Sequence, residues 1–416
     1  MNKDVYIKNR KNLVKNIDNN SIIILFAGNA PKKTGDENYA FTPNRNFYYL
    51  TGIEEEEHIV LISKIKGLVV EKVFLKEINL VEEMWTGKTL RDNEAKEISG
   101  IEDVSYMNEF NDYINRLIKG TEEINIYLDL DKENFNERES SGLCYANYIR
   151  RKYPQVIIKN VSSKITPLRM IKSKEEIAEL QKAIDITIEG VKSLMNNAKS
   201  GMKEYELEAY FDFECKTRGA KDYAFRTIAA AGKNATTLHY VDNNSEIKSE
   251  DLILFDLGAQ WNCYNADITR TFPIGGKFNI RQREVYEAVL RVNKAVIDKI
   301  KPGVVYKELN LWARDLIADE CIKLGIIKEK EEVSKYYWHS IGHNLGLDTH
   351  DVESQGREFI FEKGMVFTVE PGIYIGEEGI GIRIEDDILV TDDGCVVLTK
   401  EMIKEVNEIE DFMRRR

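Results

Sequence analysis

Residues 251–274, DLILFDLGAQWNCYNADITRTFPI, contain two apolar runs, and each run carries an acid. Asp256 lies in the first run, and Asp267 follows at the start of the second. The segment between them, AQWNCYN at 259–265, holds two asparagines and has no helical period. Two apolar runs of strand length joined by such a turn predict a β-hairpin with one acid on each strand.

Two more acids lie in apolar surroundings near the end of the chain. Glu370 lies in MVFTVEPGIYI, and Glu385 lies in GIGIRIEDDILV. A buried carboxylate without a partner is too costly to keep ionised, so each acid needs a proton, a cation or strong donors. For any one acid an ordinary buried salt bridge or turn cap is the expected explanation. Four acids with only Arg270 and Arg383 near them in sequence favour two divalent cations, whose charge would balance theirs.

The histidines are clustered in the same half of the chain. There are five, and three of them fall in HSIGHNLGLDTH at 339–350. The spacing does not match the H-E-x-x-H motif, and the glycines disfavour a regular zinc-binding helix. We expect a loop and strand that present one histidine as a metal ligand and others as acid–base groups. A set of carboxylates with one imidazole favours manganese, iron or cobalt over a structural zinc site. His58 is expected to be an ordinary core residue.

Composition narrows the class of protein. The 416 residues are 43% apolar and 31% charged, as in a globular chain. The net charge of −12 disfavours nucleic-acid binding, which depends on clustered Lys and Arg. We expect no membrane association, because there is no apolar run of about 20 residues and no apolar core of a secretory signal at the start. The five cysteines form no C-x-x-C pair, which favours reduced thiols in a cytoplasm.

The first 166 residues predict an α/β domain with a mixed sheet. Short runs rich in β-branched and aromatic residues alternate with helix-like stretches around 80–98, 107–119 and 136–152. The predicted strands are Ile22–Ala27, Phe47–Thr51, His58–Ser63, Lys72–Lys76, Ile124–Leu130 and Gln155–Val161.

A second domain is expected from residue 167 to residue 416. Just after Pro167, Ser173 and Glu176 form the S-x-x-E pattern of a capping box. Apolar residues then recur every three or four positions until Gly201, which predicts a long amphipathic helix. Later helices are expected at 203–218, 280–300 and 305–324, and strands at 251–273 and 364–398.

Four segments together resemble the pita-bread metallopeptidases, a family that includes aminopeptidase P, prolidase, methionine aminopeptidase and the metal-free creatinase. They are FDLGAQWNCYNADITRTFPIGGKF, HSIGHNLGLDTHDV, FTVEPGIYI and GIGIRIEDDILV. In the first domain, ILFAG, NFYYLTGI and EEMWTGKTL are similar to the N-terminal domain of aminopeptidase P, which methionine aminopeptidase lacks. The resemblance implies a creatinase-like α/β domain over 1–166 and an α+β pita-bread catalytic domain over 167–416.

The resemblance also implies a site for two divalent metal ions, with manganese expected ahead of cobalt, iron or zinc. Asp256 would bind one metal, while His343 and Glu370 would bind the other. Asp267 and Glu385 would bridge the pair. A water activated by the metals would attack the peptide carbonyl, with Glu370 as its general base.

Further residues take roles by the same resemblance. His239 matches a histidine that helps to pass a proton to the leaving nitrogen. His350 matches one that contacts the substrate or the developing oxyanion, and His339 matches one in the proline pocket. Arg383 and Tyr374 match groups that orient ligands or substrate.

The implied activity is removal of the N-terminal residue from peptides with proline in second position, by a homodimer or homotetramer. Trp85 matches a tryptophan that can face a neighbour's active site, although an ordinary interface or core aromatic is an equal alternative. Prolidase, which cleaves Xaa-Pro dipeptides, is the nearest other function. A non-catalytic binding module and a metal-free creatinase-like hydrolase are further alternatives, and the intact ligand set disfavours both.

Overall fold

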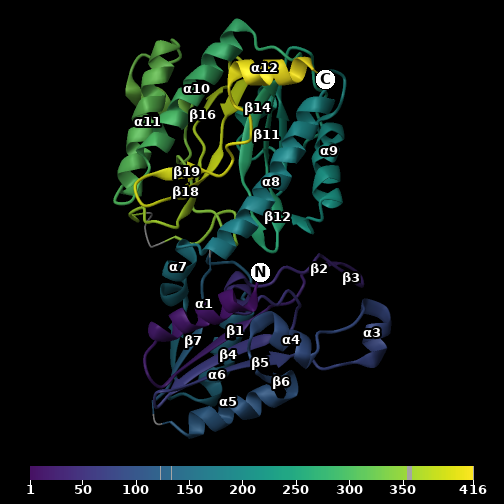
Figure 1. The fold of residues 1–416 in the computed structure, drawn as a ribbon, viewed down its shortest axis with the longest axis vertical. Helices are drawn as coiled ribbons and strands as arrows, with labels where there is room; N and C mark the ends of the chain where they lie inside the picture. Colours follow the sequence, from purple (N-terminus) through teal and green to yellow (C-terminus); the bar gives the residue numbers. More distant parts are fainter. Residues whose placement is uncertain (122, 133, 354–357, 416) are drawn as a thin grey trace. The chain divides into compact units, whose positions relative to one another are not determined.

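The computed structural model describes residues 1–121, 123–132, 134–353 and 358–415. The chain divides into two compact units, Met1–Arg169 and Met170–Arg416 (Figure 1). The boundary expected between residues 166 and 167 falls inside helix α7, Ser162–Met170, which contains Pro167.

A six-stranded mixed sheet forms the centre of the first unit, in the order β6-β5-β4-β1-β7-β8. The pairs β1–β4 and β4–β5 are antiparallel, and β5–β6, β1–β7 and β7–β8 are parallel. The mixed α/β sheet predicted from the sequence is therefore confirmed. The strands are β1 Ser21–Phe26, β4 Ile59–Ile65, β5 Leu68–Leu75, β6 Asp103–Tyr106, β7 Asn125–Leu128 and β8 Ile157–Asn160, with a separate hairpin of β2 Lys32–Thr34 and β3 Glu37–Asn38.

Helices cover both faces of this sheet. α5 and α6 pack on the face that carries Ile22 and Ile24 of β1, where Phe110 and Tyr145 meet with ring centroids 5.6 Å apart. α1, α2 and α4 pack together on the other face, which the alternate residues of β1 reach. The helices are α1 Lys3–Lys15, α2 Arg45–Thr51, α3 Leu80–Thr86, α4 Asp92–Ser99, α5 Phe110–Lys119 and α6 Ser141–Lys152, with the 3₁₀ turn η1 at Met107–Glu109.

Phe47–Thr51, predicted as a strand, forms most of helix α2 instead. Asn44 Oδ1 accepts the amide hydrogen of Phe47 at 2.9 Å and caps the helix, and Gly52 ends it in the left-handed conformation at φ 70°. The run is buried on all sides, and a short apolar run without a polar face cannot be told from a strand by its pattern. Gly87, at φ 93°, ends α3, so the helix expected at 80–98 is divided into α3 and α4.

Antiparallel strands and long helices make up the second unit, which confirms its α+β class. Its strand orders are β10-β11-β14, β13-β12-β9, β15-β18-β19 and β16-β17. The strands are β9 Asp222–Tyr223, β10 Ile228–Ala231, β11 Leu252–Leu257, β12 Ala259–Trp261, β13 Tyr264–Asn265, β14 Ile268–Pro273, β15 Val366–Val369, β16 Gly372–Ile375, β17 Ile380–Arg383, β18 Asp386–Val390 and β19 Cys395–Val397.

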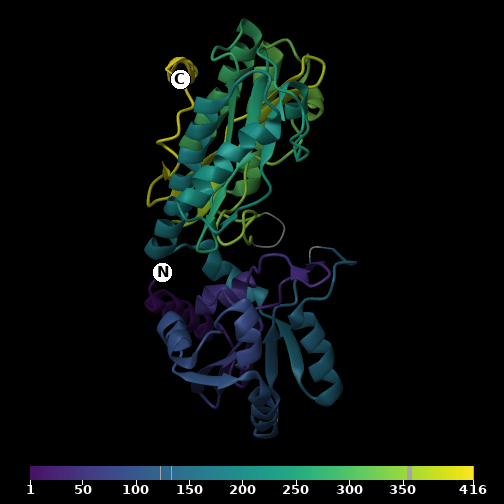
Figure 2. The same ribbon diagram turned by 90° about the vertical axis from the view of Figure 1, so that its right-hand side faces the viewer.

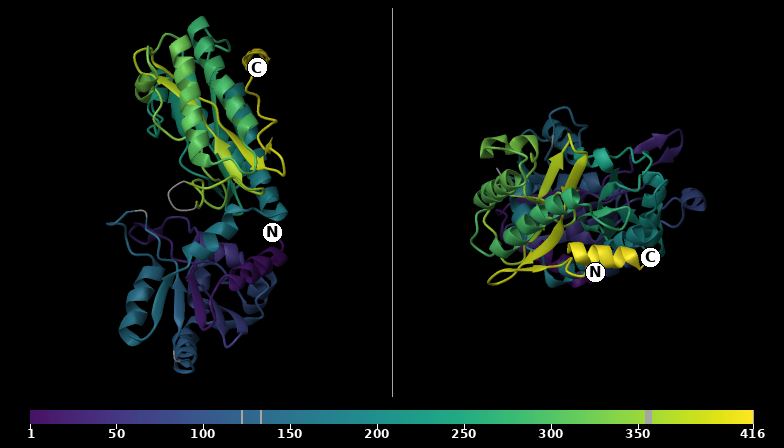
Figure 3. Two further views of the ribbon diagram at one scale, coloured as in Figure 1. Left: turned by 90° about the vertical axis from the view of Figure 1, so that its left-hand side faces the viewer. Right: turned by 90° about the horizontal axis from the view of Figure 1, so that it is seen from above.

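Long helices flank these strands, as Figures 1, 2 and 3 show. α8 packs against α9 and against β12, β13 and β14, whereas α10 packs against α11 and against β15, β16 and β17. α8 begins at the predicted capping box, in which Ser173 Oγ accepts from the Glu176 amide at 3.3 Å and the Ser173 amide donates to Glu176 Oε2 at 2.8 Å. The helices are α8 Lys174–Asn197, α9 Glu204–Thr217, α10 Ile280–Lys299, α11 Tyr306–Lys323 and α12 Val406–Arg414, with 3₁₀ turns η2 Gly232–Thr236 and η3 Lys330–Lys335.

The hairpin predicted from residues 251–274 is present, and its register fixes the positions of both acids. β11 pairs with β14 in antiparallel fashion, with Asp256 opposite Thr269. β12 and β13 continue the hairpin to a tight turn that includes Asn262 at φ 46°. Asparagine tolerates this left-handed conformation better than most residues. Asp267 directly precedes β14, so the two acids lie on adjacent strands of one hairpin.

A buried ion cluster ties the hairpin to β18. Arg270 on β14 donates from Nη2 to Asp386 Oδ1 at 2.7 Å, and both side chains are 1% exposed. Thr399 and Lys404 also donate to the Asp386 carboxylate, at 2.8 and 2.5 Å. Burial alone would raise the pKa of Asp386, but Arg270 and Lys404 outweigh burial and hold that pKa well below its usual range. The Arg270 guanidinium therefore pairs with the Asp386 carboxylate, and its Nη1 donates to the backbone carbonyl oxygen of Glu385 at 2.5 Å.

We expect Asp386→Ala to lower the free energy of unfolding by about 3–5 kcal/mol, because it leaves the buried Arg270 without its carboxylate. Urea denaturation at pH 7 measures the change. Asp392→Ala is the matched control, since Asp392 pairs with Lys363 where both side chains are more than half exposed. An exposed pair contributes about 1 kcal/mol or less. Equal losses in the two variants would contradict a structural role for the buried pair.

Candidate metal centre

Five side chains singled out from the sequence converge from separate segments of the second unit. Asp256 comes from β11, and Asp267 from the residue before β14. His343 lies in the loop before β15, Glu370 directly follows β15, and Glu385 directly precedes β18. The ends of several strands therefore supply the site.

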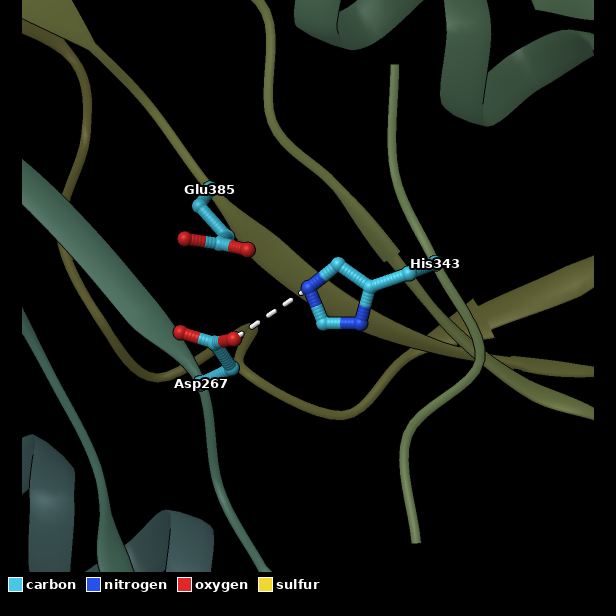
Figure 4. Close-up of side chains that lie close together, drawn as sticks. All are labelled: Asp267, His343 and Glu385. Atoms are coloured by element: carbon cyan, nitrogen blue, oxygen red, sulfur yellow. Dashed lines mark ion pairs between the residues drawn. The ribbon is translucent and has the colours of Figure 1, made fainter. Parts of the chain in front are cut away.

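The imidazole of His343 faces the acids. Its Nε2 lies 3.4 Å from Asp267 Oδ2 and 3.9 Å from Glu370 Oε1. One potential ligand atom from each of Asp267, His343 and Glu385 lies within 4.8 Å of the others, and Figure 4 shows these three side chains pointing toward one another. His343 Nδ1 lies 3.0 Å from the Asn344 carbonyl oxygen, so Nδ1 carries the hydrogen and Nε2 presents a lone pair to the acids.

The acidic side chains in this cluster outnumber the basic side chains that pair with them. Arg383 Nη2 donates to Asp256 Oδ2 at 2.5 Å. Burial, followed by repulsion from neighbouring acids, raises the pKa of Asp267 and Glu370 well above their usual values. Burial and the charge of Asp256 raise the pKa of Glu385 to about 7. Without cations, the Glu385 carboxyl therefore keeps its proton toward neutral pH, and the pKa values of Asp267 and Glu370 are shifted in the same direction.

Two carboxylate oxygens indicate that divalent cations fit this site. Asp256 Oδ1 and Asp267 Oδ1 are buried, and neither has a hydrogen-bond partner among the residues that the structure describes. A buried oxygen in this state is costly unless a cation binds it. Carboxylates with one imidazole are ligands that divalent transition metals accept. The residues present therefore fit a divalent-cation site.

Threonine hydroxyls hold His343 and Glu385 in place, and neither threonine was predicted from the sequence. Thr269 Oγ1 donates to Glu385 Oε2 at 2.7 Å and accepts from Arg383 Nε at 3.0 Å. Thr368 Oγ1 accepts the amide hydrogen of His343 at 3.1 Å. The sequence could have predicted Thr269 as a neighbour of the acids. Side chains alternate between the two faces of a strand, so Asp267 and Thr269 lie on the same face.

Arg383, Tyr374 and His339 form a connected group beside the acids. Tyr374 Oη lies 3.0 Å from Arg383 Nη1 and 2.9 Å from His339 Nε2. His339 Nδ1 lies 2.8 Å from the Ser340 carbonyl oxygen, so this nitrogen carries the hydrogen and Nε2 accepts from Tyr374. Burial and then the charge of Arg383 lower the pKa of His339 to about 3, so the imidazole is neutral near pH 7.

Two more of the predicted histidines lie near other histidines of the site. His350 packs edge-on against His343, with ring centroids 4.3 Å apart. His239 is exposed in the segment after η2, and its charge contributes to the lowered pKa of His339, which places the two side chains near each other.

The remaining residues noted from the sequence lie in the first unit. Trp85 is on α3 and is 87% exposed. His58 is buried, as expected of a core residue, and its Nδ1 accepts the amide hydrogen of Lys76 at 3.0 Å, while its Nε2 lies 3.9 Å from Glu55 Oε2.

Known sequences match both units. Residues 178–392 match metallopeptidase family M24, and residues 6–127 match the aminopeptidase P N-terminal domain. The Xaa-Pro aminopeptidase of Escherichia coli K12 is 32% identical, over 98% of this chain and 96% of its own length. The Xaa-Pro aminopeptidase 3 of Rattus norvegicus is 33% identical, over 92% of this chain and 78% of its own length.

Solved structures agree with the sequence matches. A Bacillus anthracis protein provisionally assigned as an aminopeptidase P is 46% identical, with a TM-score of 0.97 over 100% of this chain and 99% of its own. Zinc-substituted E. coli aminopeptidase P in complex with product is 30% identical, with a TM-score of 0.91 over 100% and 99%. The chain thus has the aminopeptidase P fold, with a pita-bread second domain. Since the family match covers more than half of its residues, the chain belongs to metallopeptidase family M24.

Proposed function

We propose that this protein is an Xaa-Pro aminopeptidase, a metal-dependent exopeptidase that releases the N-terminal residue from peptides with proline in second position. The convergence of four acids and one imidazole at one buried point carries the proposal, because such a site binds divalent cations. Relatives that match almost the whole chain are named Xaa-Pro aminopeptidases, and this supports the substrate class.

We assign Asp256, Asp267, His343, Glu370 and Glu385 as ligands of two divalent cations. Asp267 and Glu385, whose ligand atoms lie within 4.8 Å of each other and of one from His343, would be shared by the two cations. Asp256 would belong to one cation, and His343 and Glu370 would belong to the other. We propose manganese, with cobalt, iron and zinc as alternatives, because hard carboxylate oxygens dominate the set.

When bound, divalent cations supply an activated water and polarise the carbonyl of the scissile bond. Glu370 is the proposed general base of this protein. The Glu370 carboxylate lies 3.9 Å from His343 Nε2, within the proposed cation site, where it could take a proton from a water molecule activated there. His339 Nδ1 lies 3.6 Å from Glu370 Oε2, on the side of the site that we assign to the proline ring.

The chemistry of a prolyl bond gives roles to the other histidines. The proline nitrogen leaves as an amine and must gain a proton as the bond breaks, and exposed His239 is the proposed donor. His350, packed on His343, is proposed to contact the carbonyl oxygen as negative charge develops on it. Neutral His339 lines the proline pocket, and Tyr374 and Arg383 hold it in place.

Prolidase activity is the second candidate, because the metal site of such an enzyme would look the same. The named relatives favour the aminopeptidase. A non-catalytic binding module or a metal-free hydrolase would have no use for a complete set of ligands with two unpartnered carboxylate oxygens.

We also propose that the protein is a homodimer or homotetramer, in which Trp85 contributes to a neighbouring protomer's site. The support is helix α3, none of whose residues is buried. Its large apolar side chains are 66–87% exposed, and contiguous apolar exposure marks interaction surfaces. They are Leu80, Val81, Met84 and Trp85.

A cytoplasmic location is the proposal that the cysteines support, because all five are free thiols. Within the described ranges, no helix is long and apolar enough to cross a bilayer. The net charge of −12 argues against a nucleic-acid partner.

With Mn²⁺ bound, we expect the protein to cleave an Xaa-Pro-Xaa tripeptide and to leave the matching Xaa-Pro dipeptide uncut. Chromatography of the products measures both, and Xaa-Ala-Xaa serves as the control for the proline requirement. If only the dipeptide is cleaved, the protein is a prolidase. If the metal-loaded protein cleaves neither, the enzymatic proposal is wrong.

Glu370→Ala is expected to reduce kcat on the tripeptide by roughly 10³-fold or more, because it removes a metal ligand and the base together. Glu362→Ala is the control, since Glu362 is exposed a few residues earlier in the chain. A Glu370→Ala enzyme that retains even a tenth of the wild-type rate would show that this carboxylate is not the base.

We expect Glu385→Gln to raise the melting temperature of the metal-free protein at pH 8 and to abolish the further rise that Mn²⁺ gives the wild type. The pKa of Glu385 is raised to about 7 in the fold, against about 4.3 unfolded. Its ionisation therefore costs stability increasingly as the pH rises from about 4 through about 7. Thermal unfolding with EDTA or MnCl₂ measures both effects.

Exposed Glu401→Gln is the control for this comparison and should leave both melting temperatures unchanged. If metal-free Glu385→Gln were less stable than the wild type at pH 8, repulsion within the cluster would not be the dominant force on this side chain.

A further inference from the structure

A buried lysine lies behind the segment that carries His343 and His350. Lys172, just before the start of α8, places its Nζ 3.0 Å from Asp351 Oδ2, and both side chains are 1% exposed. Lys172 Nζ has no aligned hydrogen bond to any described residue, so the charge of Asp351 is its closest compensation. We propose that Lys172 is a positioning residue for the metal centre, acting through Asp351. This proposal rests on the metal-dependent function proposed above.

Asp351 is connected by hydrogen bonds to the proposed ligand His343. The amide of Asp351 donates to the Asn344 carbonyl oxygen at 2.9 Å. The same oxygen lies 3.0 Å from His343 Nδ1 and fixes the orientation of that imidazole. A shift of Asp351 therefore moves the group that aims His343 Nε2 at the acids.

The backbone of this segment packs directly on the ion pair. A Cβ at Gly346 would lie 2.2 Å from Asp351 Oδ2 and 3.0 Å from Lys172 Cε. Residue 346 must therefore lack a side chain for the pair to form in this position. The backbone at residue 346 therefore packs directly against the side chains of Lys172 and Asp351.

The same cluster reaches the hairpin that carries Asp267. Glu176, buried near Lys172, accepts from Tyr264 Oη at 3.0 Å. The next residue, Asn265, donates from its amide to the Gly346 carbonyl oxygen at 2.9 Å. Lys172, Asp351 and Glu176 thus form a cluster that lies against both the segment with His343 and the hairpin that carries Asp267.

Burial makes such a pair a strong positional constraint, because separating two opposite charges costs more in a medium that lacks water. Among the described residues, the ion pair of Lys172 is with Asp351 and not with any of the four acids of the site. Its effect is therefore expected on metal affinity, through the aim of His343, beyond any loss of stability.

Lys172→Met tests the proposal, since it removes the ammonium and keeps an unbranched side chain. Mn²⁺ is titrated by calorimetry into metal-free wild type and variant at a temperature where circular dichroism shows both to be folded. We expect the Kd for Mn²⁺ to weaken by roughly 10- to 100-fold, the range known for groups that orient metal ligands. Asp351→Asn, which preserves side-chain shape, should weaken it in the same direction and serves if Lys172→Met does not fold.

Ile409→Ala is the control for a purely structural effect. Ile409 is 1% exposed on α12, and its truncation should lower the melting temperature while leaving the Kd for Mn²⁺ within a factor of about two. The proposal is overturned if Lys172→Met and Asp351→Asn bind Mn²⁺ as the wild type does, or if Ile409→Ala loses as much affinity. A wild type that binds no Mn²⁺ would overturn the metal centre itself.

Discussion

Repulsion among buried carboxylates is the constraint on which the second unit depends. Asp256, Asp267, Glu370 and Glu385 share one region of the interior, and Arg383 pairs with Asp256 there. Like charges this close cannot all be ionised in a medium of low dielectric constant unless cations join them. Without cations the site must take up protons. We propose that the same side chains act as ligands of divalent cations, whose attraction replaces the repulsion.

The surrounding fold keeps these side chains together despite their repulsion. The amide of Glu385 donates to the Thr269 carbonyl oxygen at 3.1 Å, and the amide of Glu370 donates to the Ile341 carbonyl oxygen at 2.9 Å. A Cβ at Gly342 would lie 1.9 Å from a backbone oxygen of β15, so only glycine allows the histidine segment to approach that strand. The site is therefore held by backbone contacts that do not depend on the charge of its side chains.

The sequence predicted features that leave local signals. The hairpin, the capping box of α8 and the unusual placement of the acids all appear in short stretches. Features that depend on distant contacts were missed. Helix α1 was not predicted, because its buried Arg10 is compensated by Glu71 far along the chain. Thr269 and Lys172 are ordinary residues by sequence, and their importance follows from partners on other elements. Phe47–Thr51 was assigned to a strand because burial on all sides removed the helical period.

Anomalous diffraction from crystals of the manganese-loaded protein tests the central claim most directly. The account predicts two manganese peaks between Asp267 and Glu385, with Asp256 bound to one ion and His343 and Glu370 bound to the other. A map without anomalous density among these five side chains, at a manganese concentration that supports peptide cleavage, would contradict it.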